Sequence, residues 1–325
     1  MTARPFLKWA GGKSQLLPEL VRRSPRRIDT YYEPFLGGAA LFFALSSDPE
    51  RAPKRAVLND LNGALMTTYR VVRDEAPALA AALERLQGEY AAADDAGRAA
   101  MYYRVRDEHA RSDAVEVAAR VIFLNKTCFN GLFRVNRRGE FNVPFGRYRS
   151  PRILDREGLL AAAAALREVE LRSGDFAEAC AEAGRDDFVY FDPPFHPLSD
   201  TSNFTAYTER EFGRAEQIRL KRCIDVLTSR GVSVMLSNSP HPWIRGGYEF
   251  AGYAIDEVQA RRAINSRGDG RGPIGELVVT NYEEVARTQA GAVANARSAV
   301  AISSARGTSS RSMPSLKQRN STPMG

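Results

Sequence analysis

The sequence has few of the residues that build disulfide frameworks and metal centres. It contains only 3 cysteines and 3 histidines among 325 residues. They are scattered singly along the chain: Cys128, Cys180, Cys223, His109, His196 and His241. This spacing excludes a disulfide-stapled scaffold and argues against a zinc site with paired ligands. No metal cofactor is therefore expected.

Long apolar runs are also missing. No stretch approaches the roughly 20 residues that span a bilayer, and the N-terminus has basic residues but no signal-peptide core. Hydrophobic residues make up 44% and charged residues 26% of the chain, which excludes a collagen or a mostly disordered protein. We expect a globular protein in a reducing, cytoplasmic setting, without a membrane partner.

Positive charge is concentrated in two places. The net charge is +7. The segment from Glu284 to the end holds six basic residues against one acidic residue, and Lys126–Arg152 holds seven against one. The rest of the chain is slightly acidic. Concentrated basic charge favours a polyanionic partner.

Apolar periodicity predicts an α/β protein interrupted by helices. Strands are expected at Thr30–Phe35, Arg55–Leu58, Val169–Leu171, Phe188–Phe191, Val232–Leu236 and Leu277–Asn281. Helices are expected at Ser14–Arg23, Ala39–Leu45, Ala76–Tyr90, Arg98–His109, Asp113–Leu124 and Phe212–Arg230. The apolar strands suit a largely parallel sheet. Residues 1–64 and 165–283 would form this α/β domain.

The intervening residues 65–164 are expected to form a helical insertion. It ends in a loop, Asn125–Arg149, with a hairpin candidate whose strands are Phe133–Val135 and Glu140–Val143. The tail, residues 284–325, is rich in alanine, serine and arginine and lacks a sustained apolar period. We expect it to be disordered.

The sharpest motif is Asp192-Pro193-Pro194-Phe195, directly after the apolar run Phe188–Phe191. Ligands of open α/β sheets bind at the carboxyl ends of strands. A carboxylate and a rigid prolyl carbonyl, without a competing proline N–H, offer two acceptors to an amino group. The Phe195 ring adds a stacking face. The motif fits catalysis on an exocyclic amine, although such a segment can also simply end a strand.

A second motif, Glu-Pro-Phe-Leu-Gly-Gly at Glu33–Gly38, joins an expected strand to a helix through small residues. Such a turn lets a nucleotide-like cofactor approach the backbone, but the Gly-x-Gly-x-x-Gly pyrophosphate fingerprint is absent. Asp60 ends the next strand, where a carboxylate can accept from ribose hydroxyls or stay solvated. Asp175 fits an adenine amine or a helix N-cap.

Gly-Gly-Lys-Ser at residues 11–14 superficially resembles a P-loop. The residue five before Gly12 is Leu7 instead of glycine, and no strand precedes the segment. An ATPase is therefore not expected.

The basic loop alternates charged residues with aromatics and amides over Asn125–Arg134 and Phe141–Tyr148. This mixture can contact phosphates, read base edges and wedge into a base stack. It also fits a solvated hairpin packed on helices, so composition alone leaves both interpretations open.

Taken in order, these motifs resemble the Dam-type (D12 class, alpha group) DNA adenine-N6 methyltransferases over about residues 5–283. The motifs are Lys-Trp-Ala-Gly-Gly-Lys, Glu-Pro-Phe-Leu-Gly-Gly, Leu-Asn-Asp, Phe-Asn-Gly-Leu-Phe-Arg, Gly-Glu-Phe-Asn-Val-Pro-Phe-Gly, Asp-Pro-Pro-Phe and Phe-Thr-Ala-Tyr. The resemblance implies an S-adenosylmethionine-dependent methyltransferase fold, a Rossmann-like mixed sheet with an inserted helical target-recognition domain. It also implies double-stranded DNA as partner and GATC as target.

The resemblance also assigns site residues. Catalysis would involve Asp192, Pro193, Pro194 and Phe195. The S-adenosylmethionine contacts would be Trp9, Lys13, Phe35, Gly37, Asp60, Asp175 and Asp192. The DNA contacts would be Lys8, Phe129, Asn130, Leu132, Arg134, Pro144 and Tyr148.

The implied mechanism flips the target adenine out of the duplex. The base would stack on Phe195 while its amino hydrogens bind Asp192 and the Pro193 carbonyl. Phe129 could fill the vacated space, and Arg134 could read a guanine. Direct transfer from the sulfonium would follow, without a covalent enzyme intermediate.

The sequence departs from the family pattern at two places. Phe195 stands where the family usually has tyrosine, so stacking is kept and a hydroxyl is lost. Lys126–Cys128 also differs from the commonest pattern. An N4-cytosine or RNA amine methyltransferase and an inactive DNA-binding module remain alternatives. We expect a monomer, cytoplasmic at a bacterial nucleoid or phage-encoded.

Overall fold

The computed structural model describes residues 2–9, 13, 15–108, 113–136, 139–195, 212–261 and 273–282. Its contacts divide the chain into two units, residues 1–282 and 283–325. All described residues belong to the first unit. The expected disordered tail and the Phe-Thr-Ala-Tyr motif at residues 204–207 lie outside the described part of the chain.

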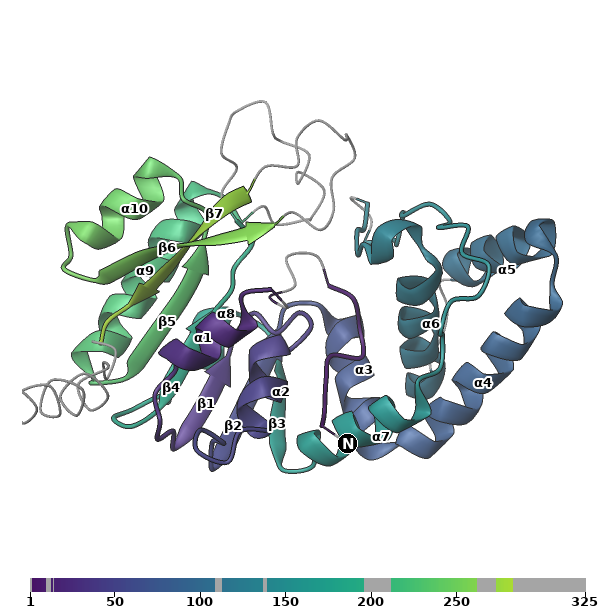
Figure 1. The fold of residues 1–325 in the computed structure, drawn as a ribbon, viewed down its shortest axis with the longest axis horizontal. Coiled ribbons are helices and arrows are strands. Elements are labelled where there is room, and N and C mark those ends of the chain that lie inside the picture. The colour runs from purple at the N-terminus through teal and green to yellow at the C-terminus, as the bar shows by residue number, and fades with distance from the viewer. Residues whose placement is uncertain are drawn as a thin grey trace, which may run out of the picture. The chain divides into compact units, whose positions relative to one another are not determined.

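The described residues form a seven-stranded sheet in the order β3-β2-β1-β4-β5-β7-β6 (Figure 1). The strands are β1 (Thr30–Glu33), β2 (Arg55–Asp60), β3 (Val169–Ser173), β4 (Phe188–Phe191), β5 (Ser233–Asn238), β6 (Ala254–Arg261) and β7 (Pro273–Thr280). The first five in space pair in parallel, whereas β7 is antiparallel to β5 and β6 is antiparallel to β7. The predicted mixed α/β sheet is confirmed.

The strand predictions need correction at several ends. β2, β3 and β5 each run two residues further than predicted, to Asp60, Ser173 and Asn238. β1 ends at Glu33 and not at Phe35, because Pro34 has no N–H to continue the ladder. β7 starts earlier than predicted, at Pro273. The edge strand β6 was not predicted, since it mixes polar with apolar residues and lacks the continuous apolar run of the buried strands.

The helices lie mostly where the periodicity predicts them. They are α1 (Leu17–Arg23), α2 (Ala40–Ser46), α3 (Gly63–Asp74), α4 (Ala76–Ala92), α5 (Asp95–Asp107), α6 (Ala114–Thr127), α7 (Arg156–Leu166), α8 (Phe176–Ala179), α9 (Arg214–Ser229) and α10 (Pro242–Glu249), with a 3-10 turn at Phe129–Gly131. No separate helix was predicted at α3, α7, α8 or α10.

The start of the basic loop was placed too early. Asp113 caps α6 by accepting from the Glu116 N–H at 2.9 Å, and the helix continues to Thr127. Asn125 is therefore helical. The predicted hairpin is reduced to an isolated bridge between Val135 and Phe141 instead of two regular strands.

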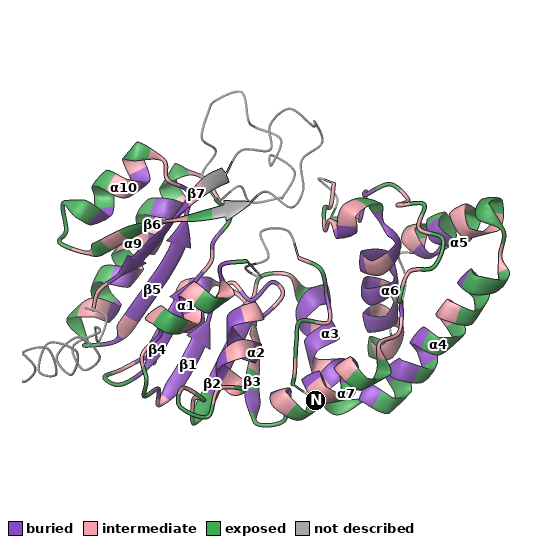
Figure 2. Cartoon of the chain, in the orientation of Figure 1, coloured by how far each residue is buried: buried purple, intermediate pink, exposed green. Residues whose placement is uncertain are grey.

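Alternate residues of the central strands pack into two separate hydrophobic clusters, one on each face of the sheet. Tyr31 and Tyr190 join a cluster that includes α2 and α3, whereas Tyr32 and Val189 join a cluster that includes α9 and α10. This alternation follows from the two-residue period of a strand. Figure 2 shows the consequence, a buried sheet between helices whose outer faces are exposed. The layered packing holds the strand ends, and the loops after them, in place.

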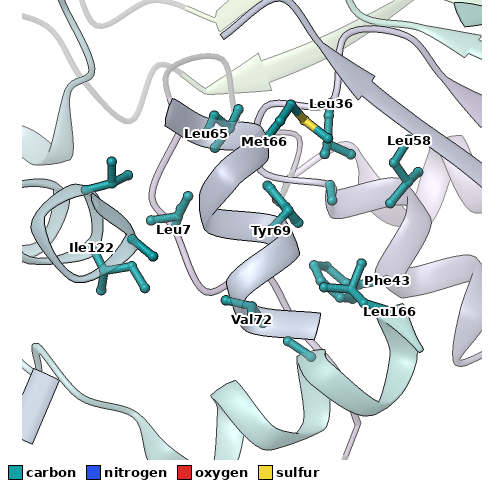
Figure 3. Packing of buried hydrophobic residues seen from close by; sticks show 14 of the residues in the cluster. Leu7, Leu36, Phe43, Leu58, Leu65, Met66, Tyr69, Val72, Ile122 and Leu166 are labelled. Carbon is teal, nitrogen blue, oxygen red and sulfur yellow. The ribbon is translucent and has the colours of Figure 1, made fainter. Parts of the chain in front are cut away.

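Helix α3 connects the sheet to the helices that follow it. Figure 3 shows Tyr69 and Val72 of α3 between Leu166 of α7 and the side of the cluster that contains Leu7 and Ile122. All five are in one continuous hydrophobic cluster. The division at residues 64 and 165 into two domains stays a prediction. No helix among the described residues is long and apolar enough to cross a membrane.

Candidate active site

The loops that follow β1, β2 and β3 are joined at one edge of the sheet. The buried Asn59 side chain donates to the carbonyls of Pro34 and Gly174, each at 3.0 Å. The backbone of Asn59 accepts from the Leu36 N–H at 2.9 Å. This is the carboxyl edge of parallel strands, where α/β proteins bind ligands.

The turn after β1 needs glycine at position 37. Gly37 has a φ of +48°, and a Cβ there would lie 2.6 Å from Cδ1 of Trp9. Its carbonyl accepts from the Tyr69 hydroxyl at 3.1 Å. Trp9 in turn stacks on Phe133, with ring centroids 5.0 Å apart. The backbone of the turn therefore packs directly against a flat ring, the indole of Trp9.

Asp60, the last residue of β2, organises the same turn. Its two carboxylate oxygens accept from the Gly37 N–H at 3.1 Å and the Asn62 N–H at 2.9 Å. Burial raises the pKa of Asp60 despite these hydrogen bonds. The half-buried Asp60 carboxylate is therefore part of the turn.

Asp192 follows β4 and is paired with a buried lysine. Lys13 Nζ lies 2.8 Å from Asp192 Oδ1 and 3.2 Å from Glu276 Oε1, and also 4.7 Å from the ring centroid of Phe195. The Lys13 side chain is 5% exposed and that of Asp192 23%. The ion pair engages one oxygen of Asp192 and leaves the carboxylate open to a ligand.

The charges of this group are strongly coupled. Burial lowers the pKa of Lys13, but Asp192 and Glu276 raise it by more, so the amine stays protonated. Burial raises the pKa of both carboxyls, and Lys13 offsets this in part. A single ammonium therefore holds two carboxylates at the end of β4 and the middle of β7.

A third acid, Glu33, lies buried at the end of β1. Burial raises its pKa to about 8, and its Oε2 accepts from the Tyr31 hydroxyl at 2.9 Å. Asp192 adds to this shift through its charge. Glu33 is therefore neutral at pH 7, which limits the negative charge beneath the site.

The two prolines after Asp192 are not equivalent. The Pro194 carbonyl accepts from Nε2 of Gln217 at 3.2 Å. The Pro194 carbonyl therefore already has a donor in the free enzyme. No hydrogen bond to the Pro193 carbonyl comes from the part of the chain that the structure describes. Pro193 is the carbonyl that can serve an amine.

Asp175 caps a helix and carries an ion pair. It accepts from the Ala177 N–H at 2.9 Å, which confirms the N-cap interpretation. Arg219 binds both of its oxygens, at 2.9 and 2.5 Å, and the pair lowers the pKa of Asp175. Nearby, Phe35 stacks on Phe176 at 5.2 Å between centroids.

The N-terminal segment is fastened to the basic loop. Asn125 accepts from the Lys8 N–H at 2.8 Å and donates to the Lys8 carbonyl at 2.6 Å and the Gly131 carbonyl at 3.3 Å. Phe129, which lies between Asn125 and Gly131 in the sequence, is 47% exposed. Asn130 has a positive φ of 56°, a conformation that asparagine tolerates. The loop presents an exposed aromatic on a fixed backbone.

The remaining predicted DNA contacts lie on the same loop. The exposed Arg134 donates from Nε to Asn142 Oδ1 at 2.7 Å, and Lys8 Nζ lies 5.5 Å from the Tyr148 ring centroid. Pro144 is exposed, and its carbonyl accepts from the Phe129 N–H at 2.9 Å. Leu132 is half-buried.

The family description "D12 class N6 adenine-specific DNA methyltransferase" matches residues 9–264. This range contains Trp9, the turn at Gly37, the basic loop and the loop that begins at Asp192. The chain belongs to this family. It is an adenine-specific DNA methyltransferase, as the resemblance predicted.

Three relatives give this D12 methyltransferase its context. It is 41% identical over 292 residues to the type II methyltransferase M.MjaIII of Methanocaldococcus jannaschii, covering 87% of this chain and 100% of that protein. It is 42% identical to M1.LlaDCHI of Lactococcus lactis subsp. cremoris, over 86% and 95% of the two chains. It is 35% identical to the DNA adenine methylase of Escherichia coli K12, over 85% and 94%.

The D12 methyltransferase contains partners that sequence reasoning missed. Glu276 and Arg219 hold predicted site residues, and Gln217 holds the Asp192 loop. Each comes from β7 or α9, far along the chain from its partner, and none belongs to a recognisable motif. Among the described residues no group of three His, Cys, Asp or Glu side chains could hold a metal ion.

Proposed function

We propose that this enzyme transfers the methyl group of S-adenosylmethionine to N6 of an adenine flipped out of double-stranded DNA. The observation that carries the proposal is the Asp192 loop. It combines a partly open carboxylate, a Pro193 carbonyl to which no described residue donates, and a ring, Phe195, that is 37% exposed. An adenine amino group has two hydrogens for the two acceptors, and its ring can stack on Phe195.

The residues at the β1 and β2 ends fit a nucleoside-containing cofactor. The cradle beside Gly37 has no room for a Cβ, and it lies against the flat indole of Trp9. Lys13, Phe35, Asp60, Asp175 and Asp192 are the other proposed cofactor contacts. When bound, S-adenosylmethionine supplies an electrophilic methyl group. The protein orients the amine and stabilises its charge.

Asp192 accepts one amino hydrogen and localises the nitrogen lone pair, which the adenine ring otherwise withdraws. The carboxylate can do this without being a strong base, because the amine loses its proton readily once it is methylated. Lys13 favours the ionised form of Asp192 next to Glu276. In the free enzyme Lys13 also faces Phe195, and it would shift when the base stacks there.

We assign DNA contact to the basic loop and its neighbours. Arg134 reads a guanine, Phe129 fills the space left by the flipped base, and Leu132 or Pro144 meets a thymine methyl. The proposed contacts to the DNA backbone come from Lys8, Asn130 and Tyr148. The exposed Phe129 and Arg134 on a fastened loop favour this assignment.

We further propose that the target is GATC. The enzyme would act as a monomer in the cytoplasm. The Dam-type motifs favour this target, and relatives named DNA adenine methylase are 34–35% identical. The test is transfer of labelled methyl groups to duplexes that contain GATC or a single-base variant of it. Methylation of GATC alone is expected. Equal labelling of all duplexes would contradict the target, and labelling of RNA or of cytosine N4 would contradict the substrate.

A fluorescence experiment tests base flipping. A duplex with 2-aminopurine in place of the target adenine should brighten on binding, because unstacking removes quenching. The same probe two positions away is the control. Unchanged fluorescence of the target probe during tight binding would contradict flipping.

A further inference from the structure

The Asp-Pro-Pro segment leaves the sheet just where it must hold a substrate. The pairing of β4 with β5 ends at Phe191 opposite Leu236. Neither Pro193 nor Pro194 has an N–H to extend the parallel ladder. The catalytic carbonyl of Pro193 and the ring of Phe195 therefore lack the support that strand pairing gives to the rest of β4.

Two buried amide side chains supply a different support. Gln217, in the first turns of α9, is 3% exposed, and Asn238, the last residue of β5, is 0% exposed. Asn238 Nδ2 donates to Gln217 Oε1 at 3.0 Å, and Gln217 Nε2 donates to the Pro194 carbonyl at 3.2 Å. A chain of hydrogen bonds thus runs from the end of β5 to the loop.

The direction of this chain is fixed at both ends. The Ser239 N–H can only donate, and it donates to Asn238 Oδ1 at 2.8 Å. The Pro194 carbonyl can only accept. Each amide therefore has one orientation that satisfies its neighbours, and the alternative would set two acceptors or two donors against each other.

We infer that Gln217 and Asn238 are positioning residues that set the geometry of methyl transfer. The Pro194 carbonyl belongs to the peptide plane that leads into Phe195. Fixing that plane fixes the approach of the stacking ring. It also engages the Pro194 carbonyl and leaves the Pro193 carbonyl for the amine. This inference rests on the proposed role of the Asp192 loop, and it goes beyond that role by explaining what holds the loop.

The test measures single-turnover methyl transfer by Gln217→Glu and Gln217→Met in the full-length enzyme. Glutamate has the shape of glutamine but puts an acceptor against the Pro194 carbonyl, and methionine removes the amide without leaving a large cavity. Both variants should slow the methyl-transfer step by about 10- to 100-fold, since a small misplacement of the reacting groups is costly. The dissociation constants for DNA and S-adenosylmethionine should change little.

Two further variants separate positioning from stability. Ile224→Val creates a small cavity in the same helix and should lower the melting temperature without slowing transfer. Asn238→Ala should slow transfer, but combining it with Gln217→Met should add little, because the two amides act through one chain. Additive effects, or slowing by Ile224→Val equal to that by Gln217→Met, would overturn the inference.

Asp192→Ala distinguishes this inference from the proposed function. If Asp192→Ala is inactive and Gln217→Met transfers at the wild-type rate, the positioning role is wrong and the function stands. If Asp192→Ala remains active, the proposed chemistry itself is wrong.

Discussion

At the scale of single residues, the site depends on how burial and charge are balanced. Lys13 is shared by Asp192 and Glu276, whereas the buried Glu33 takes a hydrogen bond from the Tyr31 hydroxyl. An acid in such surroundings is held neutral, because desolvation penalises its charged form. The enzyme thus pairs the carboxylate after β4 with the Lys13 ammonium, and it keeps the nearby Glu33 carboxyl mostly protonated at pH 7.

The protonation of Glu33 predicts how stability depends on pH. Its folded pKa of about 8 lies above the ordinary value of 4.5, so between these values the folded state binds more protons than the unfolded state. The free energy of unfolding should therefore fall as pH rises from about 4.5 to about 8, by up to about 1.4 kcal/mol per pH unit from this group.

Glu33→Gln, which mimics the neutral acid, should flatten that slope. The measurement is urea unfolding of both proteins at several pH values. Other buried acids titrate in both proteins, so the difference between the two slopes isolates Glu33. Parallel curves would show that Glu33 is ionised in the folded enzyme.

Arg134 provides a prediction about sequence choice. Its Nε and one Nη donate to Asn142, and the guanidinium has further N–H groups that can donate to a base. Arg134→Ala should relax discrimination at one guanine by about 1–3 kcal/mol. The measurement compares kcat/KM on duplexes that differ at single positions.

Arg149→Ala removes the same charge from the same segment and serves as the control. It should weaken binding to all duplexes equally. If Arg134→Ala behaves in the same way and changes only the salt dependence, Arg134 contacts phosphate and does not read a base.

At the scale of elements, the basic loop is held by close backbone contacts. A Cβ on Gly146 would lie 2.5 Å from Tyr148 Cε2 and 2.6 Å from the Cys128 carbonyl oxygen. Gly146 also donates its N–H to the Thr127 carbonyl at 2.9 Å. The start and end of the loop are therefore in direct contact.

Gly146→Ala should push these two ends apart. We expect a loss of stability of about 1–3 kcal/mol, as for overpacking in a filled region, together with weaker DNA binding. Gly88→Ala, in α4 where an added Cβ would meet no other atom within 4 Å, should instead stabilise by about 0.5–1 kcal/mol. Thermal unfolding and DNA titration of both variants check this. Normal DNA affinity in Gly146→Ala would show that binding does not depend on the loop backbone.

The sequence was sufficient for elements with a strong local signal. The apolar run Phe188–Phe191 followed by Asp-Pro-Pro located β4 and the loop after it, and Asp175 was identified as a possible N-cap. The sequence did not predict the edge strand β6, because its polar residues interrupt the apolar pattern that identifies a strand. It also missed Gln217, because a buried amide in a helix gains its meaning only from the carbonyl that the fold brings opposite.

At the scale of the whole molecule, catalysis is expected from the first compact unit alone. Residues 1–282 contain every candidate site residue, and residues 283–325 form the other unit. Their surplus of basic residues gives them charge but no motif. The tail is therefore expected to affect DNA binding at most through long-range attraction.

A variant truncated after residue 285 tests this expectation. Its kcat should equal that of the full chain, and its DNA affinity should fall little at physiological salt. The measurement is DNA binding at several salt concentrations. A large loss of affinity with a clearly smaller salt slope would show that the tail is a basic arm on the phosphate backbone.

The central claim is that the loop after β4 directs a methyl group to the amino nitrogen of adenine. Its most direct test is nucleoside analysis by mass spectrometry of duplex DNA incubated with labelled S-adenosylmethionine and either the wild-type enzyme or Asp192→Ala. The wild type should form N6-methyladenine, and the variant should bind DNA but form none. N4-methylcytosine as the product, or N6-methyladenine at the wild-type rate from Asp192→Ala, would contradict the account.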